Sequence, residues 1–419
     1  MNLSTPAPAA PVLTLTFATS LGTAVLTVGM YILTTQAHGY GVGLNYALAL
    51  TFGVLYVISA MTVGRVMRAL RARRPSLTPR RLLAWILALM SASCFVPLIG
   101  VAAMPDSGGW AWWIVAATYG PLTGAVWPII ESYVSGGRSG SAIHRATGRF
   151  NITWAGAMVV AFWSIAPLVE SHQEWAVALL GLAHAASIVT LRALPSDPPP
   201  HPEGDEHQAP PGYRALLSSF RVLLPTSYLC SKALSPYLPI AMNDLLIAAW
   251  AQTPIVSVTY FTQTLGFVWL ARTESWRGRG WLPTLAAVLL VAGFAGALVA
   301  PGLDRGTLGV ALLILALALF GVALAAVYAG GLYYAMAVGR SEVDAGGTHE
   351  GLIGIGNAGG PVCGLGAVAA VQVGLLPERS LESAVAVLVL LATVGLCVYG
   401  LTRSRKVSGV SGSSPGSGG

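Results

Sequence analysis

Long apolar runs without a single charged residue constrain the fold of this chain more than any other feature. Two of them cover residues 281–301 and 306–337. A helix needs about 20 apolar residues to cross about 30 Å of hydrocarbon, because each residue advances about 1.5 Å and every backbone polar group must be bonded internally. Only 9% of the 419 residues are charged, whereas a soluble domain carries about 25%. The sequence therefore predicts an all-α integral membrane protein.

Hydropathy read in a window of about 19 residues predicts twelve transmembrane helices. The first run, 11–34, is rich in threonine and follows no Lys or Arg, which favours a retained span over a secretory signal. The predicted spans are 11–34, 42–63, 81–104, 110–134, 149–170, 174–192, 221–243, 250–271, 281–301, 306–337, 350–374 and 381–402.

The basic residues are distributed very unevenly between the predicted loops. Of the 23 Lys and Arg, 20 fall in alternate loops, and the exceptions are Lys232, Arg305 and Arg379. By the positive-inside rule, this pattern predicts a multi-pass protein of the plasma (inner) membrane with both termini cytoplasmic. The net charge of +7 is then explained by membrane topology, and no nucleic-acid partner is expected.

A proline- and acid-rich segment, Leu194–Gly212, divides the chain and cannot form a packed helix. The predicted units are a six-helix bundle at 1–193, a cytoplasmic linker at 194–220, a second six-helix bundle at 221–403 and a disordered tail at 404–419. Fragments of the two bundles are similar: 125–139 resembles 326–341, and 148–157 resembles 351–360. Two six-helix repeats of the same orientation are therefore predicted.

Two six-helix halves, a long cytoplasmic linker, cytoplasmic termini and basic loops after spans two, four, eight and ten resemble the major facilitator superfamily over roughly residues 11–402. The acid of that family's loop signature, four positions after Gly64, is replaced here by Arg68. The fragment Gly359-Gly360-Pro361 resembles an antiporter signature, but it lies in span eleven instead of span five. The resemblance implies a secondary transporter with a central substrate site between its halves.

Lys232 is the most informative ionisable residue, since a charge inside a span costs several kcal/mol, from about 2.5 upward. It follows Arg221 by eleven residues, or about 16 Å of helical rise, which places it near the middle of the bilayer. Lys232 either faces the cavity between the halves and attracts an anionic group of the substrate, or bonds helix carbonyls and hydroxyls as a structural contact.

Further polar residues within the spans are candidates for substrate binding. Those of the first span recur every three or four residues and form one stripe, which either lines a cavity or packs between helices. The candidates are Thr23, Thr27, Tyr31, Tyr260, Gln263, Tyr328 and Asn357.

A second set of residues is predicted to couple or gate transport. Glu131 lies near the cytoplasmic end of span four, ahead of Arg138 and Arg149. It would alternate between an arginine partner and a proton, or form a fixed ion pair with one of these arginines. His349 and Glu350, at the start of span eleven, either titrate or act as an interfacial cap.

The leading functional prediction is a secondary active transporter that moves a small organic solute by alternating access, with proton coupling left open. Neither a GxxxxGK[ST] loop nor an HExxH motif is present, so neither an enzyme nor a metal or cofactor is predicted. An intramembrane lipid-modifying enzyme, a transporter-like receptor and a lipid scramblase remain alternatives. The expected partners are membrane lipids and a solute that is anionic or zwitterionic, or else amphipathic and neutral, and the protein is expected to be monomeric.

Overall fold

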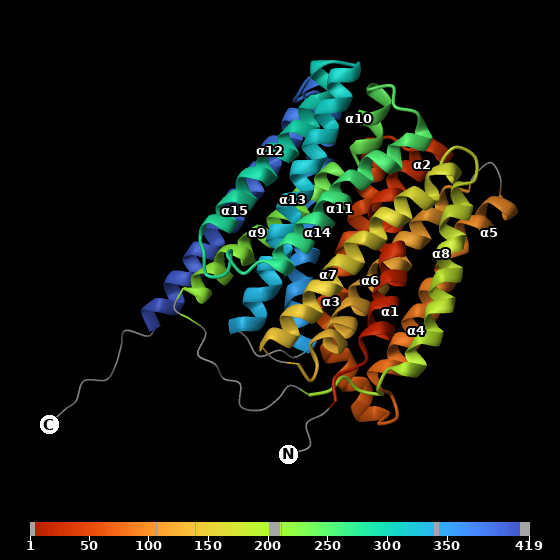
Figure 1. The fold of residues 1–419 in the computed structure, drawn as a ribbon. Coiled ribbons are helices and arrows are strands. Elements are labelled where there is room, and N and C mark those ends of the chain that lie inside the picture. Colours follow the sequence, from red (N-terminus) through yellow and green to blue (C-terminus); the bar gives the residue numbers. More distant parts are fainter. Residues whose placement is uncertain are drawn as a thin grey trace.

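The described chain is a bundle of long helices that run roughly side by side (Figure 1). The computed structural model describes residues 5–104, 108–138, 140–200, 210, 212–338 and 343–410. The N-terminal helices are α1 (Ala9–Ala24), the π-helical turn η1 (Val25–Gly29), α2 (Met30–His38), α3 (Val42–Arg73), α4 (Pro79–Cys94), α5 (Val96–Ala103), α6 (Trp110–Ser135), α7 (Gly140–Ile165), η2 (Ala166–Leu168), α8 (Gln173–Ser187) and η3 (Ile188–Ala193). The C-terminal helices are α9 (Tyr213–Leu234), α10 (Leu238–Asp244), α11 (Ala249–Arg272), α12 (Trp281–Leu303), α13 (Thr307–Val338), α14 (Val343–Gln372), η4 (Glu378–Ser380) and α15 (Leu381–Val410).

Several helices extend beyond the spans that hydropathy predicts. Helix α3 continues to Arg73, although the span was predicted to end at residue 63. Helix α15 continues to Val410, so residues 404–410 of the predicted disordered tail are helical, and 411–419 lie outside the described residues. Hydropathy marks where a helix leaves an apolar environment, whereas the helix itself can continue with charged residues that favour helical structure.

Ten helical segments within the described chain are long and apolar enough to cross a membrane. The two other predicted spans coincide with α9 plus α10 and with α11. Helix α9 carries Lys232, and α11 buries several polar side chains, including Gln252 and Gln263. These polar groups lower the hydropathy of helices that lie among other helices.

Several helix pairs join the N-terminal helices to the C-terminal helices, and two of them are the most extensive. Helix α3 packs against α14, and α7 packs against α11. The α3–α14 contact is close, since a Cβ atom on Gly53 would lie only 2.4 Å from the carbonyl oxygen of Asn357. Small residues permit such close approach of two backbones in membrane proteins.

The end of the bundle at which α3, α6 and α11 finish carries most of the basic residues, and we call it the basic end (lower in Figure 1). The first part of the linker lies against the N-terminal helices there. Arg80 donates a hydrogen bond of 2.8 Å to the Leu194 carbonyl, and Arg71 forms an ion pair of 2.7 Å with Asp197. This segment is thereby held against the N-terminal helices. Residues 213–220 of the predicted linker belong to helix α9, which begins at Tyr213.

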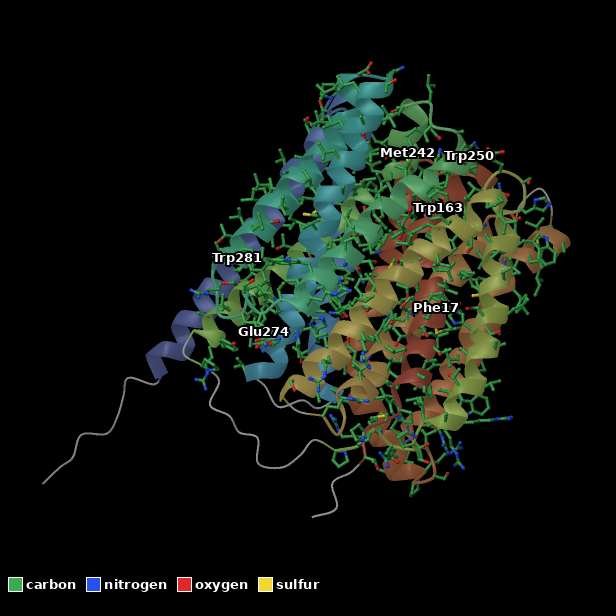
Figure 2. The ribbon with its side chains drawn as sticks, in the orientation of Figure 1. Phe17, Trp163, Met242, Trp250, Glu274 and Trp281 are labelled. Carbon is green, nitrogen blue, oxygen red and sulfur yellow. The ribbon has the colours of Figure 1, made fainter. Side chains whose placement is uncertain are left out.

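Apolar side chains cover much of the outer surface of the bundle. Phe17, Trp163 and Trp250 are exposed on it (Figure 2). Charged residues gather at the ends of the helices instead. A bundle with an apolar outer surface and charged ends is suited to a lipid bilayer.

Candidate functional site

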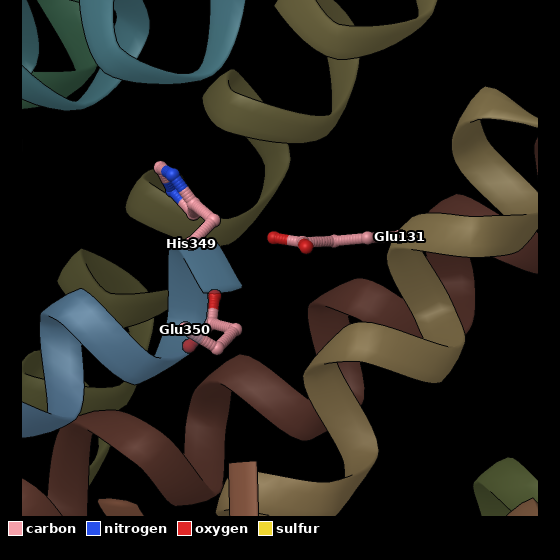
Figure 3. A group of neighbouring side chains, drawn as sticks. All are labelled: Glu131, His349 and Glu350. Carbon is pink, nitrogen blue, oxygen red and sulfur yellow. The ribbon is translucent and has the colours of Figure 1, made fainter. Parts of the chain in front are cut away.

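Two buried carboxylates and one histidine meet between the N-terminal and C-terminal helices. Glu131 comes from α6, and His349 and Glu350 come from α14. One oxygen of each carboxylate and one ring nitrogen of the histidine lie within 4.8 Å of one another. Figure 3 shows the carboxylate of Glu131 pointing from α6 toward the two residues of α14. We call these three residues the Glu–His–Glu cluster.

Tyrosine hydroxyl groups from two further helices contact the cluster. Tyr56 of α3 donates a hydrogen bond to Glu350 Oε2, and Tyr328 of α13 donates a long bond of 3.5 Å to Glu131 Oε1. The ring of Tyr328 also lies edge-on to His349, with 5.2 Å between the ring centroids. Helices of both parts of the chain therefore supply the polar environment of the cluster.

Glu131 does not pair with the arginines that the sequence analysis expected. Arg138 instead donates hydrogen bonds to the backbone carbonyls of Tyr133, at 3.0 Å, and Ala7, at 2.6 Å, while Arg149 is exposed on α7. Among the described residues, no lysine or arginine forms an ion pair with Glu131 or Glu350. Proximity in the sequence suggested arginines, but the helix direction turns Glu131 inward and leaves these arginines at the basic end.

His349 and Glu350 are not an interfacial cap. Their exposed fractions are 5% and 3%, and helix α14 begins six residues before His349, at Val343. Both side chains therefore lie inside the bundle. The interfacial-cap interpretation therefore does not fit this pair, and titration stays a prediction.

Lys232 is buried in α9, and its amino group donates a hydrogen bond of 2.9 Å to the Thr27 carbonyl. Thr27 belongs to the π-helical turn η1. No carboxylate of the described chain forms an ion pair with Lys232. The bond to a helix carbonyl matches the structural interpretation, while the position between N-terminal and C-terminal helices is the one that a central site requires.

The other predicted substrate residues differ in their surroundings. Tyr31 and Tyr260 are buried and close enough to interact electrostatically. The ring of Tyr260 also stacks on that of Phe162 of α7. The side-chain oxygens of Gln263 and Asn357 are buried without a hydrogen-bond partner among the described groups. Thr23 differs, because its hydroxyl donates to the Thr19 carbonyl of its own helix.

Sequence reasoning missed Tyr56 and Tyr228. Tyr228 lies one turn before Lys232 on α9. It is close enough to Glu131, Glu350 and Tyr260 to interact with them electrostatically. A tyrosine inside an apolar run gives little signal, because it packs as readily as phenylalanine. Only the position of Tyr228 four residues before Lys232, on the same face of a helix, could have indicated it.

Comparison with known proteins decides the fold. No protein-family model matches the sequence, and no curated protein is significantly similar to it. Among solved structures, the nucleoside transporter NupG matches 96% of this chain and 99% of its own, with a TM-score of 0.61 and 13% identity. The human organic anion transporter MFSD10 (TETRAN) matches 93% of this chain and 99% of its own, with a TM-score of 0.57 and 16% identity. The chain has the major facilitator superfamily fold.

A POT family transporter in complex with 5-aminolevulinic acid is similar as well, with a TM-score of 0.62 and 12% identity. The alignment covers 95% of this chain and 96% of that transporter. The major facilitator fold, together with the ten apolar helical segments, makes the chain a multi-pass membrane protein. The resemblance inferred from the sequence is thereby confirmed for the fold. These structural neighbours are transporters of different solutes, so the fold by itself does not select a substrate.

Proposed function

We propose that this protein is a secondary active transporter that moves a small organic solute by alternating access and couples this movement to protons. The Glu–His–Glu cluster carries the proposal. It joins α6 to α14, and its two carboxylates have no cationic partner among the described residues. A buried carboxylate without a counter-charge is very costly, so a closed cluster has to take up a proton or another cation.

Opening of the bundle at the basic end would separate α6 from α14 and expose the cluster to water. The carboxylates could then release or exchange their protons, and closure would require protons again. The groups around the carboxylates are His349 on α14, Tyr56 on α3 and Tyr328 on α13, with Tyr228 of α9 close enough to interact with them electrostatically. None of these groups is a permanent cation, so the neutralising charge has to come from solution, and a proton can supply it.

Substrate binding is assigned to the region around Lys232, at the contact of α9 with η1. An ammonium group has three donors, and the Thr27 carbonyl accepts one. The unpartnered oxygens of Gln263 and Asn357 add acceptors within the bundle. The buried amino group suits an anionic group of the substrate, and the amide oxygens suit a hydrogen-bond donor such as the ammonium group of a zwitterion.

The proposal includes the membrane layout that this mechanism needs. Helix α9 with α10, and helix α11, would cross the membrane with the ten apolar segments, which gives twelve spans in two six-helix halves. The basic end would face the cytoplasm of a plasma (inner) membrane, with both termini on that side.

Transport into proteoliposomes tests the proposal. The probes would be radiolabelled uridine, 5-aminolevulinic acid, a dipeptide and an organic anion such as benzoate. We expect at least one of them to accumulate under an inwardly directed proton gradient, and the accumulation to disappear with a protonophore. Glu131→Gln should abolish this accumulation but retain exchange of labelled for unlabelled substrate. Gradient-driven accumulation by Glu131→Gln at the wild-type rate would contradict proton coupling, and binding without exchange would indicate a receptor.

A further inference from the structure

The Glu–His–Glu cluster also has the donor set and spacing of a transition-metal site. Its two carboxylate oxygens and one imidazole nitrogen lie within 4.8 Å of one another. Ligands bound tetrahedrally to one zinc ion at about 2.0–2.2 Å lie about 3.3–3.6 Å apart, so the three side chains would have to close in by about 1 Å to complete the geometry. We propose that Glu131, His349 and Glu350 bind one divalent transition-metal ion of the zinc class, which ties α6 to α14.

Two buried atoms at the site lack a partner, and this observation is independent of the spacing. Among the described groups, neither Nε2 of His349 nor Oε2 of Glu131 has a hydrogen-bond partner, although the two side chains are only 5% and 9% exposed. The Glu131 carboxylate points into the space beside His349 and Glu350 (Figure 3). An unpartnered buried polar group costs about 1–3 kcal/mol, and coordination of an ion would remove part of that cost.

The chemistry of the donors selects the class of metal. Imidazole together with carboxylate suits zinc, iron, nickel and copper, whereas magnesium and calcium prefer sites made of oxygen ligands alone. A divalent ion would also balance the charge of the two carboxylates, which have no cationic partner in the described chain. Three protein ligands leave a fourth position open for water or another small ligand.

The surrounding tyrosines provide the outer contacts that metal-binding carboxylates need. Tyr56 donates to the Oε2 of Glu350, and Tyr328 donates to the Oε1 of Glu131. Hydrogen bonds of this kind orient the ligating carboxylates, and their loss typically lowers metal affinity about 10- to 100-fold. The metal ion would therefore meet a site whose ligands are already oriented by α3 and α13.

Metal binding by the purified full-length protein tests this inference. The protein, in detergent and free of any affinity tag, would be titrated with zinc chloride, and bound metal and melting temperature would be measured. We expect one zinc ion per chain and a melting temperature that rises with free zinc, because a ligand stabilises the state that it binds. Magnesium chloride at the same concentration should have no effect. Because no transport is measured, the outcome does not depend on the proposed function.

Matched variants locate the ion. His349→Asn and Glu131→Gln should each weaken zinc affinity by about 100-fold or more, whereas His144→Asn and His172→Asn, at histidines outside the cluster, should leave it unchanged. X-ray absorption of the zinc-bound wild type should show only nitrogen and oxygen ligands, at about 2.0–2.2 Å. Equal zinc affinity in the wild type and in His349→Asn would overturn the proposal. Sulfur ligands at about 2.3 Å would do the same, and this readout remains valid even if a variant fails to fold.

Discussion

The amino group of Lys232 donates a hydrogen bond of 2.9 Å to the backbone carbonyl of Thr27. The bond joins the C-terminal helix α9 to the N-terminal turn η1, where the π-helical pattern replaces the regular α-helical hydrogen bonds. Lys232 is only 7% exposed, and this carbonyl accepts one of its three donors. An ammonium group held in this way retains the capacity to bind an anionic group of a substrate.

Replacement of Lys232 by alanine should abolish stabilisation of the protein by anionic ligands. The melting temperature of the purified protein would be measured with benzoate, 5-aminolevulinic acid and uridine. We expect the first two to raise the melting temperature of the wild type but not of Lys232→Ala, because the variant lacks the buried cation. Thr23→Ala should respond like the wild type, since that hydroxyl bonds its own helix. An identical response of Lys232→Ala would show that the lysine has a structural role only.

Valine in place of Gly53 should destabilise the contact between α3 and α14. The added Cβ would lie 2.4 Å from the Asn357 carbonyl oxygen, so the helices would have to move apart. Overpacking of this kind typically costs about 1–3 kcal/mol, and the melting temperature should fall. Gly156→Val is the matched control, because nothing lies within 4 Å of the Cβ position there. Equal melting temperatures of the two variants would contradict this close approach of the helices.

Much of the fold follows from the sequence, because apolar runs of membrane length have few alternatives to a helix. The predicted spans 110–134 and 174–192 coincide with α6 and with α8 plus η3 within one residue at each end. Helix ends were less predictable where polar residues continue a helix, as α3 does from residue 63 to Arg73. The turn η1 could not be predicted, since hydropathy does not distinguish a π-helical turn from an α-helical one.

The candidate site could be predicted only in part. Buried charge singled out Glu131, His349, Glu350 and Lys232, because such residues are costly inside a span. Their partners could not be found in this way. Glu131 and Glu350 are separated by 219 positions in the chain, and only the packing of α6 against α14 brings them together. Sequence proximity pointed to arginines instead, and a tyrosine such as Tyr56 carries no charge that would mark it.

Residues at the two ends of α11 should be accessible from opposite sides of the membrane. Asp244 and Ser275 are both exposed, and α11 (Ala249–Arg272) lies between them. In intact cells expressing variants without the native cysteines, a membrane-impermeant maleimide should label Asp244→Cys. Ser275→Cys should be labelled only after permeabilisation. Labelling of both from the same side would contradict the proposal that α11 crosses the membrane.

A disulfide between positions 148 and 271 should hold the basic end closed. A Cβ on Gly148 of α7 would lie 3.0 Å from the Cβ of Ala271 on α11, somewhat shorter than the 3.5–4.5 Å typical of a disulfide, so a small separation of the helices would permit the bond. In a chain without its four native cysteines and with a protease site inserted in the linker, oxidation of Gly148→Cys/Ala271→Cys should keep the two fragments together on a non-reducing gel. Transport in proteoliposomes should stop and should return after reduction.

The single variants Gly148→Cys and Ala271→Cys provide the control for this disulfide, since each should separate into two fragments and transport normally under oxidising conditions. Full transport by the oxidised double variant, with the disulfide confirmed on the gel, would contradict a cycle in which α7 and α11 part at the basic end. That result would agree with a close contact between these helices but would contradict the proposed role of this contact in alternating access. Movement elsewhere in the bundle would then have to admit the substrate.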